Sequence, residues 1–267
     1  MNFDYKTLEE NCVDYLYKEY KSQLKNMQSR NEQNIVKDFK LFDYYLTNIE
    51  KIDDDTILTI AICDAIKNDK DYDKYLREYI SDYRDYKPDF HPYFKSSFSP
   101  GLIKWANGNS IGNSKGNGAM MRISPVGFLF DSEDEVIKNA RLATIPSHNS
   151  EEAIDSATKI ALIIFYLRKG YSKEEVFNML DINVKYTPFK KFNTTCKETI
   201  DNCLYAFYYS NSFIDAMQKT LLMGGDTDTN CAIVGGMAEA CYGIDETIIH
   251  DVNMKIPHKF VEVLTKD

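Results

Sequence analysis

The chain has 267 residues, 43% of them hydrophobic, which is enough for one large or two small domains. Its formal net charge of −9 argues against a nucleic-acid-binding surface, because such a surface needs a basic face. The longest apolar run, residues 160–167, is too short to cross a bilayer, so we expect no membrane partner.

The cysteines and the N-terminal residues bear on where the protein works. The six cysteines form no Cys-x-x-Cys pair and no zinc-binding spacing. Residues 1–11 lack the apolar core of a signal peptide. We therefore expect a soluble, intracellular protein, cytoplasmic by default, with reduced thiols. No change in composition divides the chain, so we expect one domain over residues 1–267.

Apolar residues recur at three- and four-residue spacing along the chain, which predicts helices. In chain order, these predicted helices cover residues 57–66, 150–167, 196–209, 213–222 and 232–242. Ser132 and Ser172, each followed by Glu three positions later, predict two more helix starts. Strand signals are poor. The predicted fold class is all-α, a single compact multi-helix domain packed around the Ala-rich helix 232–242.

Two acidic segments stand directly before apolar runs, far apart in the chain. The first contains Asp53, Asp54 and Asp55, and the second contains Asp226, Asp228 and Thr229. One Asp is enough to cap a helix, so each segment carries more acid than a cap requires. The alternative is two unrelated capped helices whose acids are solvated.

If the two segments meet, their carboxylates share one pocket. Each pair of like charges about 4 Å apart then costs on the order of 4 kcal/mol at an effective dielectric constant near 20. Protons or bound cations must relieve that repulsion. Carboxylate and hydroxyl oxygens suit hard cations such as Mg²⁺, Mn²⁺ or Ca²⁺. The sequence therefore predicts one shared cation site.

A third segment, residues 108–122, is dense in Gly, Asn and Ser. Gly116 and Gly118 permit close approach of a ligand to the backbone, and an apolar run that follows indicates a helix start. Free amides at such a junction bind anions, although the spacing is not that of a P-loop. The alternative is a surface loop. Arg122 has two interpretations, a phosphate contact or an ion pair with an acid.

His148 precedes the predicted helix 150–167. Asn149 has Glu152 three residues after it, so one interpretation is an N-cap at Asn149 with a capping-box Glu. The other is that His148 donates a hydrogen bond to a ligand hydroxyl or phosphate.

Taken together and in this order, the segments resemble the ADP-ribosylglycohydrolase family. Residues 53–59 (Asp-Asp-Asp-Thr-Ile-Leu-Thr) are similar to the family's Thr-Asp-Asp-Thr motif and the helix after it, and residues 116–127 to its substrate loop. His148 falls where the family has a loop histidine, and residues 224–229 (Gly-Gly-Asp-Thr-Asp-Thr) are similar to its C-terminal metal motif. The resemblance covers about residues 35–245.

The resemblance implies an all-α fold with two divalent ions, usually Mg²⁺ and alternatively Mn²⁺, at the base of an ADP-ribose cleft. Asp53 stands where the family usually has a liganding Thr. The implied metal ligands are Asp53, Asp54, Asp55, Asp226, Asp228 and Thr229, and Asp54 and Asp55 also take part in catalysis. The implied substrate-binding residues are Gly116, Asn117, Gly118, Ala119, Met120 and His148, with loop amides holding the pyrophosphate.

The N-terminus departs from the family pattern. The family usually has a Gly-rich helix containing Gly-Asp, followed by a Glu near the scissile bond, whereas residues 11–24 contain no glycine. We treat residues 1–34 as a divergent N-terminal helix and linker. Glu32 is the best positional candidate for the catalytic Glu, and the alternative is a surface Glu in a polar linker.

Two functions follow from the resemblance. The first is a Mg²⁺-dependent hydrolase that removes ADP-ribose from a modified acceptor, by water attack at the anomeric carbon of the distal ribose. The acceptor is a protein side chain, a nucleic-acid end or the acetyl group of O-acetyl-ADP-ribose. The second is a catalytically impaired module that binds ADP-ribose. The leaving group depends on cleft-rim loops, which we place at residues 89–100 and 183–195, and their contents do not reveal it.

Overall fold

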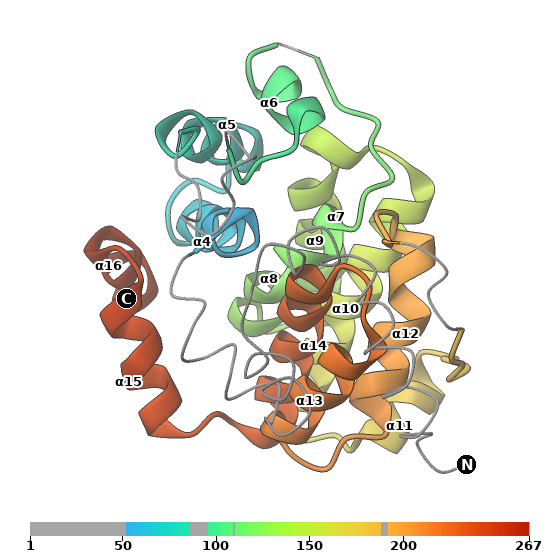
Figure 1. Ribbon diagram of the computed structural model, residues 1–267. Coiled ribbons are helices and arrows are strands. Elements are labelled where there is room, and N and C mark those ends of the chain that lie inside the picture. The colour runs from blue at the N-terminus through green and yellow to red at the C-terminus, as the bar shows by residue number, and fades with distance from the viewer. Residues whose placement is uncertain (1–51, 86–95, 109, 188–191, 267) are drawn as a thin grey trace, which may run out of the picture.

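The computed structural model describes residues 52–85, 96–108, 110–187 and 192–266. Within these residues the regular secondary structure is helical, and two isolated β-bridges are the only strand-like pairings. The all-α expectation is therefore confirmed. The helices, labelled in Figure 1, are α4 (Asp54–Lys67), α5 (Tyr72–Asp82), α6 (Pro100–Ala106), α7 (Gly118–Met121), α8 (Ser124–Leu129), α9 (Glu133–His148), α10 (Glu151–Arg168), α11 (Lys173–Met179), α12 (Cys196–Tyr208), α13 (Phe213–Met223), α14 (Thr227–Tyr242), α15 (Glu246–Lys255) and α16 (His258–Thr265).

Two helices, α10 and α14, form the centre of the fold (Figure 1). α14 packs against α4, α7, α8, α10, α12 and α13, so its first turn is surrounded by other elements. α10 is buried along most of its length and packs on α7, α8, α9, α12 and α14. Its Ala and Ile residues recur at helical spacing, which explains why several helices approach it closely. The predicted Ala-rich centre thus shares its role with α10.

α4 joins the central pair to the outer helices. Its buried face includes Ile57, Leu58 and Ile62, and it packs on α5, α8, α14 and α16. In α16, Phe260 is fully buried and its ring lies 5.1 Å from that of Tyr83. These contacts fix the direction of α4 and thereby place its first turn beside α14.

Local sequence explains most helix ends. Ser132, Ser172 and Ser212 accept hydrogen bonds from the amides three residues later, as N-cap residues do. After α10, Gly170 has φ +92°, a conformation that favours glycine. The five cysteines in the described ranges are free thiols. No helix in those ranges is both long enough and apolar enough to cross a membrane.

The predicted N-cap at Asn149 is wrong. Ser150 caps α10, because its extended backbone places its hydroxyl where it accepts from Ala153 N at 3.3 Å. α9 continues to His148, so Asn149 lies between two helices. Glu152 does not close a capping box. Its carboxylate accepts from Lys197 N at 2.9 Å and ties α10 to the start of α12.

Close packing of α8 on α10 generates a prediction. A Cβ added at Gly127 would lie 2.6 Å from both Ala161 O and Ile164 Cβ. Gly127→Ala should lower the free energy of unfolding by about 1–3 kcal/mol, the usual cost of overpacking. In α14, the Cβ added at Gly235 would meet only the end of the Met217 side chain, with Cε at 3.8 Å and Sδ at 3.9 Å. Gly235→Ala should therefore be neutral or stabilising by up to about 1 kcal/mol. Urea unfolding followed by circular dichroism measures both, and equal effects would contradict the packing described.

Candidate divalent-cation and ligand site

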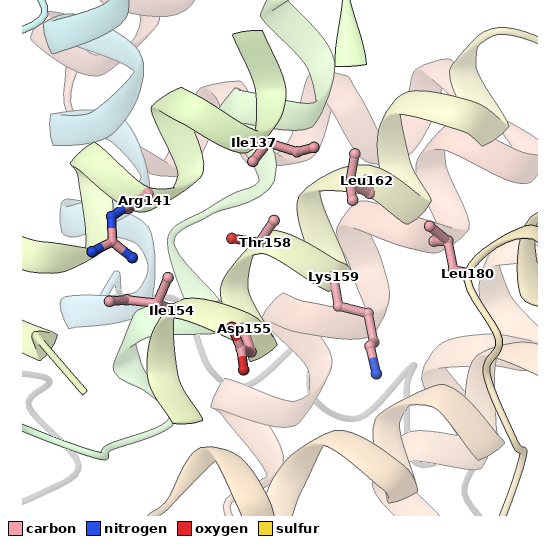
Figure 2. Close-up of a pocket in the computed structure, with 8 residues that line it drawn as sticks. All are labelled: Ile137, Arg141, Ile154, Asp155, Thr158, Lys159, Leu162 and Leu180. Carbon is pink, nitrogen blue, oxygen red and sulfur yellow. The ribbon is translucent and has the colours of Figure 1, made fainter. Parts of the chain in front are cut away.

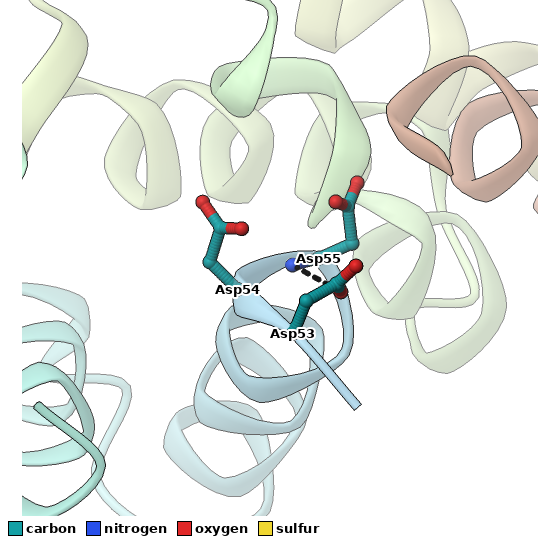
Figure 3. A group of neighbouring side chains, drawn as sticks. All are labelled: Asp53, Asp54 and Asp55. Atoms are coloured by element: carbon teal, nitrogen blue, oxygen red, sulfur yellow. Dashed lines mark hydrogen bonds between the residues drawn. The ribbon is translucent and has the colours of Figure 1, made fainter. Parts of the chain in front are cut away.

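The first turns of α4 and α14 bring the two acidic segments together. Thr229 Oγ1 lies 3.4 Å from Asp55 Oδ2, across 174 residues of sequence. Within the first segment, Asp53, Asp54 and Asp55 each offer a carboxylate oxygen within 4.8 Å of the others. Figure 3 shows these three side chains around the helix start, with Asp55 N donating to Asp53 Oδ1 at 3.1 Å. Asp53 thus caps α4, and Asp54 and Asp55 are carboxylates beyond those that the cap requires.

The electrostatics show that the segments act on each other. Burial, and then the charge of Asp228, raises the pKa of Asp53 to about 6. Burial, with Asp53 and Asp228, raises the pKa of Asp54 to about 8. The pKa of Asp55 rises well above its ordinary value, first through burial and then through the other four carboxylates. Burial and Asp228 raise the pKa of Asp226 to about 8. All these shifts have the same sign, because each carboxylate is desolvated beside like charges.

Asp55 is the most confined member of this cluster. Its side chain is buried, and its Oδ1 has no hydrogen-bond partner in the described part of the chain. A buried polar atom without a partner costs about 1–3 kcal/mol, and more if it is charged. The donor set around it consists of carboxylates and the Thr229 hydroxyl, which are hard oxygen ligands. These residues fit a divalent cation, which would supply the missing partner and offset the repulsion.

Asn193, which no pattern in the sequence indicated as a site residue, holds Asp226 in place. Asn193 Oδ1 accepts from Asp226 N at 2.6 Å. Its Nδ2 donates to Asn230 Oδ1 at 3.0 Å and to Thr199 Oγ1 at 2.7 Å. Only 1% of Asn193 is exposed. One amide side chain therefore links the turn before α14 to α14 itself and to α12.

Asn117 connects the Gly-rich loop to the same carboxylate. Its Nδ2 donates to Asp226 Oδ2 at 2.7 Å, and its backbone N donates to Thr194 O at 3.0 Å. Cys196 N donates to Lys115 O at 2.9 Å on the other side of the loop. The predicted rim loop at residues 183–195 therefore contacts both the Gly-rich loop, through Thr194, and the acidic cluster, through Asn193. The sequence predicted a helix from residue 196, but no sequence signal showed that Asn193 reaches Asp226.

The loop amides differ from the sequence-based expectation. Asn117 N, Ala119 N and Met120 N donate to the carbonyl oxygens of Thr194, Gly116 and Asn117. Gly116 N donates to Ser114 Oγ at 3.0 Å. Among the described residues, Gly118 N has no acceptor. These three amides are therefore not free to bind pyrophosphate, because Ala119 N and Met120 N donate within the turn and Asn117 N donates to Thr194 O.

His148 lies beside this loop. Its side chain is buried, and its Nε2 is 3.4 Å from the position of a Cβ at Gly116 and 3.6 Å from one at Gly118. A bridge between Asn113 and His148 fixes the loop to the end of α9. Because neither glycine carries a side chain, the imidazole lies directly against the loop backbone. A Cβ at Gly116 would also have Ser114 Oγ at 3.1 Å, and one at Gly118 would have Met121 Cε at 3.6 Å. Arg122 forms no ion pair with an acid among the described residues, and its Nη2 donates to Ser147 Oγ at 2.6 Å.

Glu32 falls outside the described residues, so its place relative to the cluster is not defined. A surface groove between α9 and α10 is lined by Ile137, Arg141, Ile154, Asp155, Thr158, Lys159, Leu162 and Leu180 (Figure 2). It contains none of the predicted site residues and no group of neighbouring carboxylates.

The fold and the site define an all-helical protein with a candidate divalent-cation centre beside a Gly-rich loop. The family model for ADP-ribosylglycohydrolase matches residues 16–265, and the chain belongs to this family.

Curated relatives and a solved structure agree with this assignment. The chain is 26% identical over 143 residues to the ADP-ribosyl-[dinitrogen reductase] glycohydrolase of Rhodospirillum rubrum, covering 49% of this chain and 47% of the relative. It is 25% identical over 151 residues to the ADP-ribosylarginine hydrolase Tri1 of Serratia proteamaculans (strain 568), covering 51% and 41%. The chain thus spans about half the length of these relatives. A solved structure titled ADP-ribosylglycohydrolase-related protein complex shares the fold, with TM-score 0.55 and 19% identity over 79% of this chain and 75% of that one.

The crowding at Asp55 generates a prediction. Asp55→Asn should raise the free energy of unfolding in EDTA by about 1–2 kcal/mol at mildly alkaline pH, because it removes one of several neighbouring negative charges. It should also remove the increase in melting temperature that Mg²⁺ gives the wild type. Differential scanning fluorimetry with and without Mg²⁺ measures both effects. Asp155→Asn, on the exposed face of α10, is the control and should change neither. A loss of stability of Asp55→Asn in EDTA would contradict the repulsion.

The role of Asn193 can be separated from its contribution to folding. Asn193→Ala should lower the free energy of unfolding by about 2–3 kcal/mol, because buried partners are left unpaired. It should also weaken Mg²⁺ binding about 10-fold or more, as loss of a second-shell contact does. The matched control is Asn202→Ala. Asn202 is equally buried, but it forms its hydrogen bonds with Thr187 N and Thr187 O rather than with a residue of the acidic cluster. Calorimetric Mg²⁺ titration distinguishes the two variants, and equal weakening in both would mean that Asn193 acts only on stability.

Proposed function

We propose that this protein is a divalent-cation-dependent hydrolase that removes ADP-ribose from a modified acceptor. The supporting observation is the juxtaposition of the two acidic helix starts, with the unpartnered Asp55 Oδ1 between them, beside the Gly-rich loop. Family membership supports the same reaction class.

The reaction is hydrolysis of the bond between the anomeric carbon of the distal ribose and the acceptor. The oxygen of water bonds to that carbon, the bond to the acceptor nitrogen or oxygen breaks, and one water proton passes to the acceptor. Free ADP-ribose and the unmodified acceptor are the products. The transition state has oxocarbenium character, as in glycoside hydrolysis generally, so a negative field close to the ribose stabilises it.

Each part of the site has a role in this scheme. We assign two divalent ions to the cluster, with Mg²⁺ the first candidate and Mn²⁺ the second. Their ligands are Asp53, Asp54, Asp55, Asp226, Asp228 and Thr229. When bound, such ions polarise oxygen ligands and lower the pKa of water.

The remaining roles belong to protein groups. Asp54 and Asp55 are the carboxylates that we assign to accept a proton from the attacking water. Gly118 N and His148 face the position that we assign to the pyrophosphate, and Gly116, Asn117, Ala119 and Met120 build the loop that presents it. Glu32 remains the candidate for proton transfer at the leaving group.

The names of the curated relatives suggest which acceptor to test first. One is named for ADP-ribosylarginine and another for modified dinitrogen reductase. ADP-ribosylarginine therefore comes first, followed by ADP-ribosylserine, nucleic-acid ends and O-acetyl-ADP-ribose.

Removal of one ligand tests the reaction. Asp228→Asn should reduce Mg²⁺-dependent release of ADP-ribose by about 100-fold or more, because a neutral amide oxygen is a weaker ligand than a carboxylate. Chromatographic assay of released ADP-ribose, with and without EDTA, measures this. Asp155→Asn should retain full activity. A correctly folded Asp228→Asn protein with wild-type turnover would exclude the mechanism.

A second function, a binding module without turnover, is favoured by the divergent segment 11–24, which has no glycine. The two functions separate when calorimetry with ADP-ribose is paired with the turnover assay. Micromolar binding with no release from any of the four substrates would support the binding module. Mg²⁺-dependent turnover of any one of them would exclude it.

A further inference from the structure

Arg122 is a buried cation to which the proposed reaction assigns no role. It follows α7, is 1% exposed, and its Nη1 has no hydrogen-bond partner in the described part of the chain. Its Nη2 donates to Ser147 Oγ at 2.6 Å and lies 3.4 Å from His148 Nδ1. Burying a guanidinium costs several kcal/mol, so a contact that justifies the burial is expected at its head group.

The hydrogen bonds at Ser147 determine which nitrogen of His148 carries the proton. A guanidinium has only donors, so Ser147 Oγ accepts from Arg122 and keeps its own hydrogen available. His148 Nδ1 is 2.7 Å from that hydroxyl. A guanidinium can only donate, and its Nη2 and the serine hydroxyl both face Nδ1, so the geometry favours Nδ1 as the accepting nitrogen. In a neutral imidazole the other nitrogen, Nε2, then carries the proton.

The surroundings keep this imidazole uncharged. Burial, and then the positive charge of Arg122, lowers the pKa of His148 well below its ordinary value. His148 is therefore a neutral residue near pH 7, with one donor and one acceptor. The acceptor, Nδ1, is already occupied by Ser147 and Arg122. The ring can therefore serve a ligand only by donating from Nε2.

The Nε2 atom faces the Gly-rich loop. It lies close to Gly116 and Gly118, neither of which carries a side chain. Gly118 N has no acceptor among the described residues, so two neutral N–H groups are available at one place. Neutral donors side by side suit an anionic oxygen such as that of a phosphate.

We propose that Arg122 is a positioning residue that acts through Ser147 to hold His148 as the Nε2–H tautomer. His148 is thereby a neutral donor to a pyrophosphate oxygen of ADP-ribose. The ligand assignment rests on the proposed function, whereas the tautomer is a property of the protein without ligand.

The first experiment reads the tautomer directly. Long-range ¹H–¹⁵N correlation spectra of the ¹⁵N-histidine-labelled protein distinguish the two neutral forms and the imidazolium, and His148→Gln identifies the resonance. The wild type should show the Nε2–H form. Ser147→Ala should populate the Nδ1–H form, because the hydroxyl donor at Nδ1 is lost. Thr144→Val, which removes another buried hydroxyl one turn earlier in α9, is the matched control and should leave the spectrum unchanged.

The second experiment reads the consequence for binding. Ser147→Ala should weaken ADP-ribose binding about 10-fold in calorimetry, the usual effect of losing one well-placed hydrogen bond. Mg²⁺ affinity should stay at the wild-type value, because Ser147 has no contact with the acidic cluster. In the turnover assay the loss should appear in KM rather than in kcat. Arg122→Lys, which keeps the charge but loses the planar group, should behave as Ser147→Ala does.

Several results would overturn the proposal. A wild-type spectrum of the Nδ1–H form or of the imidazolium would exclude the tautomer, and so would a Ser147→Ala spectrum identical to the wild type. Equal weakening of ADP-ribose binding in Thr144→Val would show that the effect is merely structural. If the wild type binds Mg²⁺ but not ADP-ribose, the ligand assignment and the proposed function both fail, while the spectrum still decides the tautomer.

Discussion

The structure depends on the burial of like charges where the first turns of α4 and α14 meet. Desolvation alone raises the pKa of the buried carboxylates, and their mutual repulsion raises it further. A fold devoted only to stability would not retain this arrangement, because replacing one acid by a neutral residue removes the repulsion. The cluster is therefore best understood as part of a binding site, in which stability without a ligand is reduced in exchange for affinity.

Uncharged polar side chains give this cluster its shape. Asn193 and Asn117 hold Asp226 through its backbone amide and its carboxylate, and they do so without adding charge. The same asparagines join the Gly-rich loop to the segment before α12. The acidic cluster and the Gly-rich loop are therefore one hydrogen-bonded unit, so a displacement of the loop is transmitted to Asp226. On the other side of the loop, Arg122 is close enough for its charge to act on Asp54.

Local patterns predicted the helices well and the contacts between them poorly. The periodicity in residues 150–167 depends only on neighbours three and four positions away, and α10 covers almost the same residues. The cap was assigned one residue too early, because Asn149 and Ser150 are both good caps and only the backbone conformation distinguishes them. The use of the loop amides was not predictable, since their acceptors include Thr194, which is remote in sequence. Asn193 was missed for the same reason.

By itself, the sequence determined the helical class, the two acidic helix starts and the glycine-rich loop, together with the family that these motifs indicate in combination. These features are local, because they depend on residue type and on spacing within one segment. Only the tertiary structure decided which carboxylates share one desolvated volume, which amides remain available and which nitrogen of His148 faces the loop. Those properties come from burial and from hydrogen bonds between distant segments, such as the one between Asn117 and Asp226 across 109 residues.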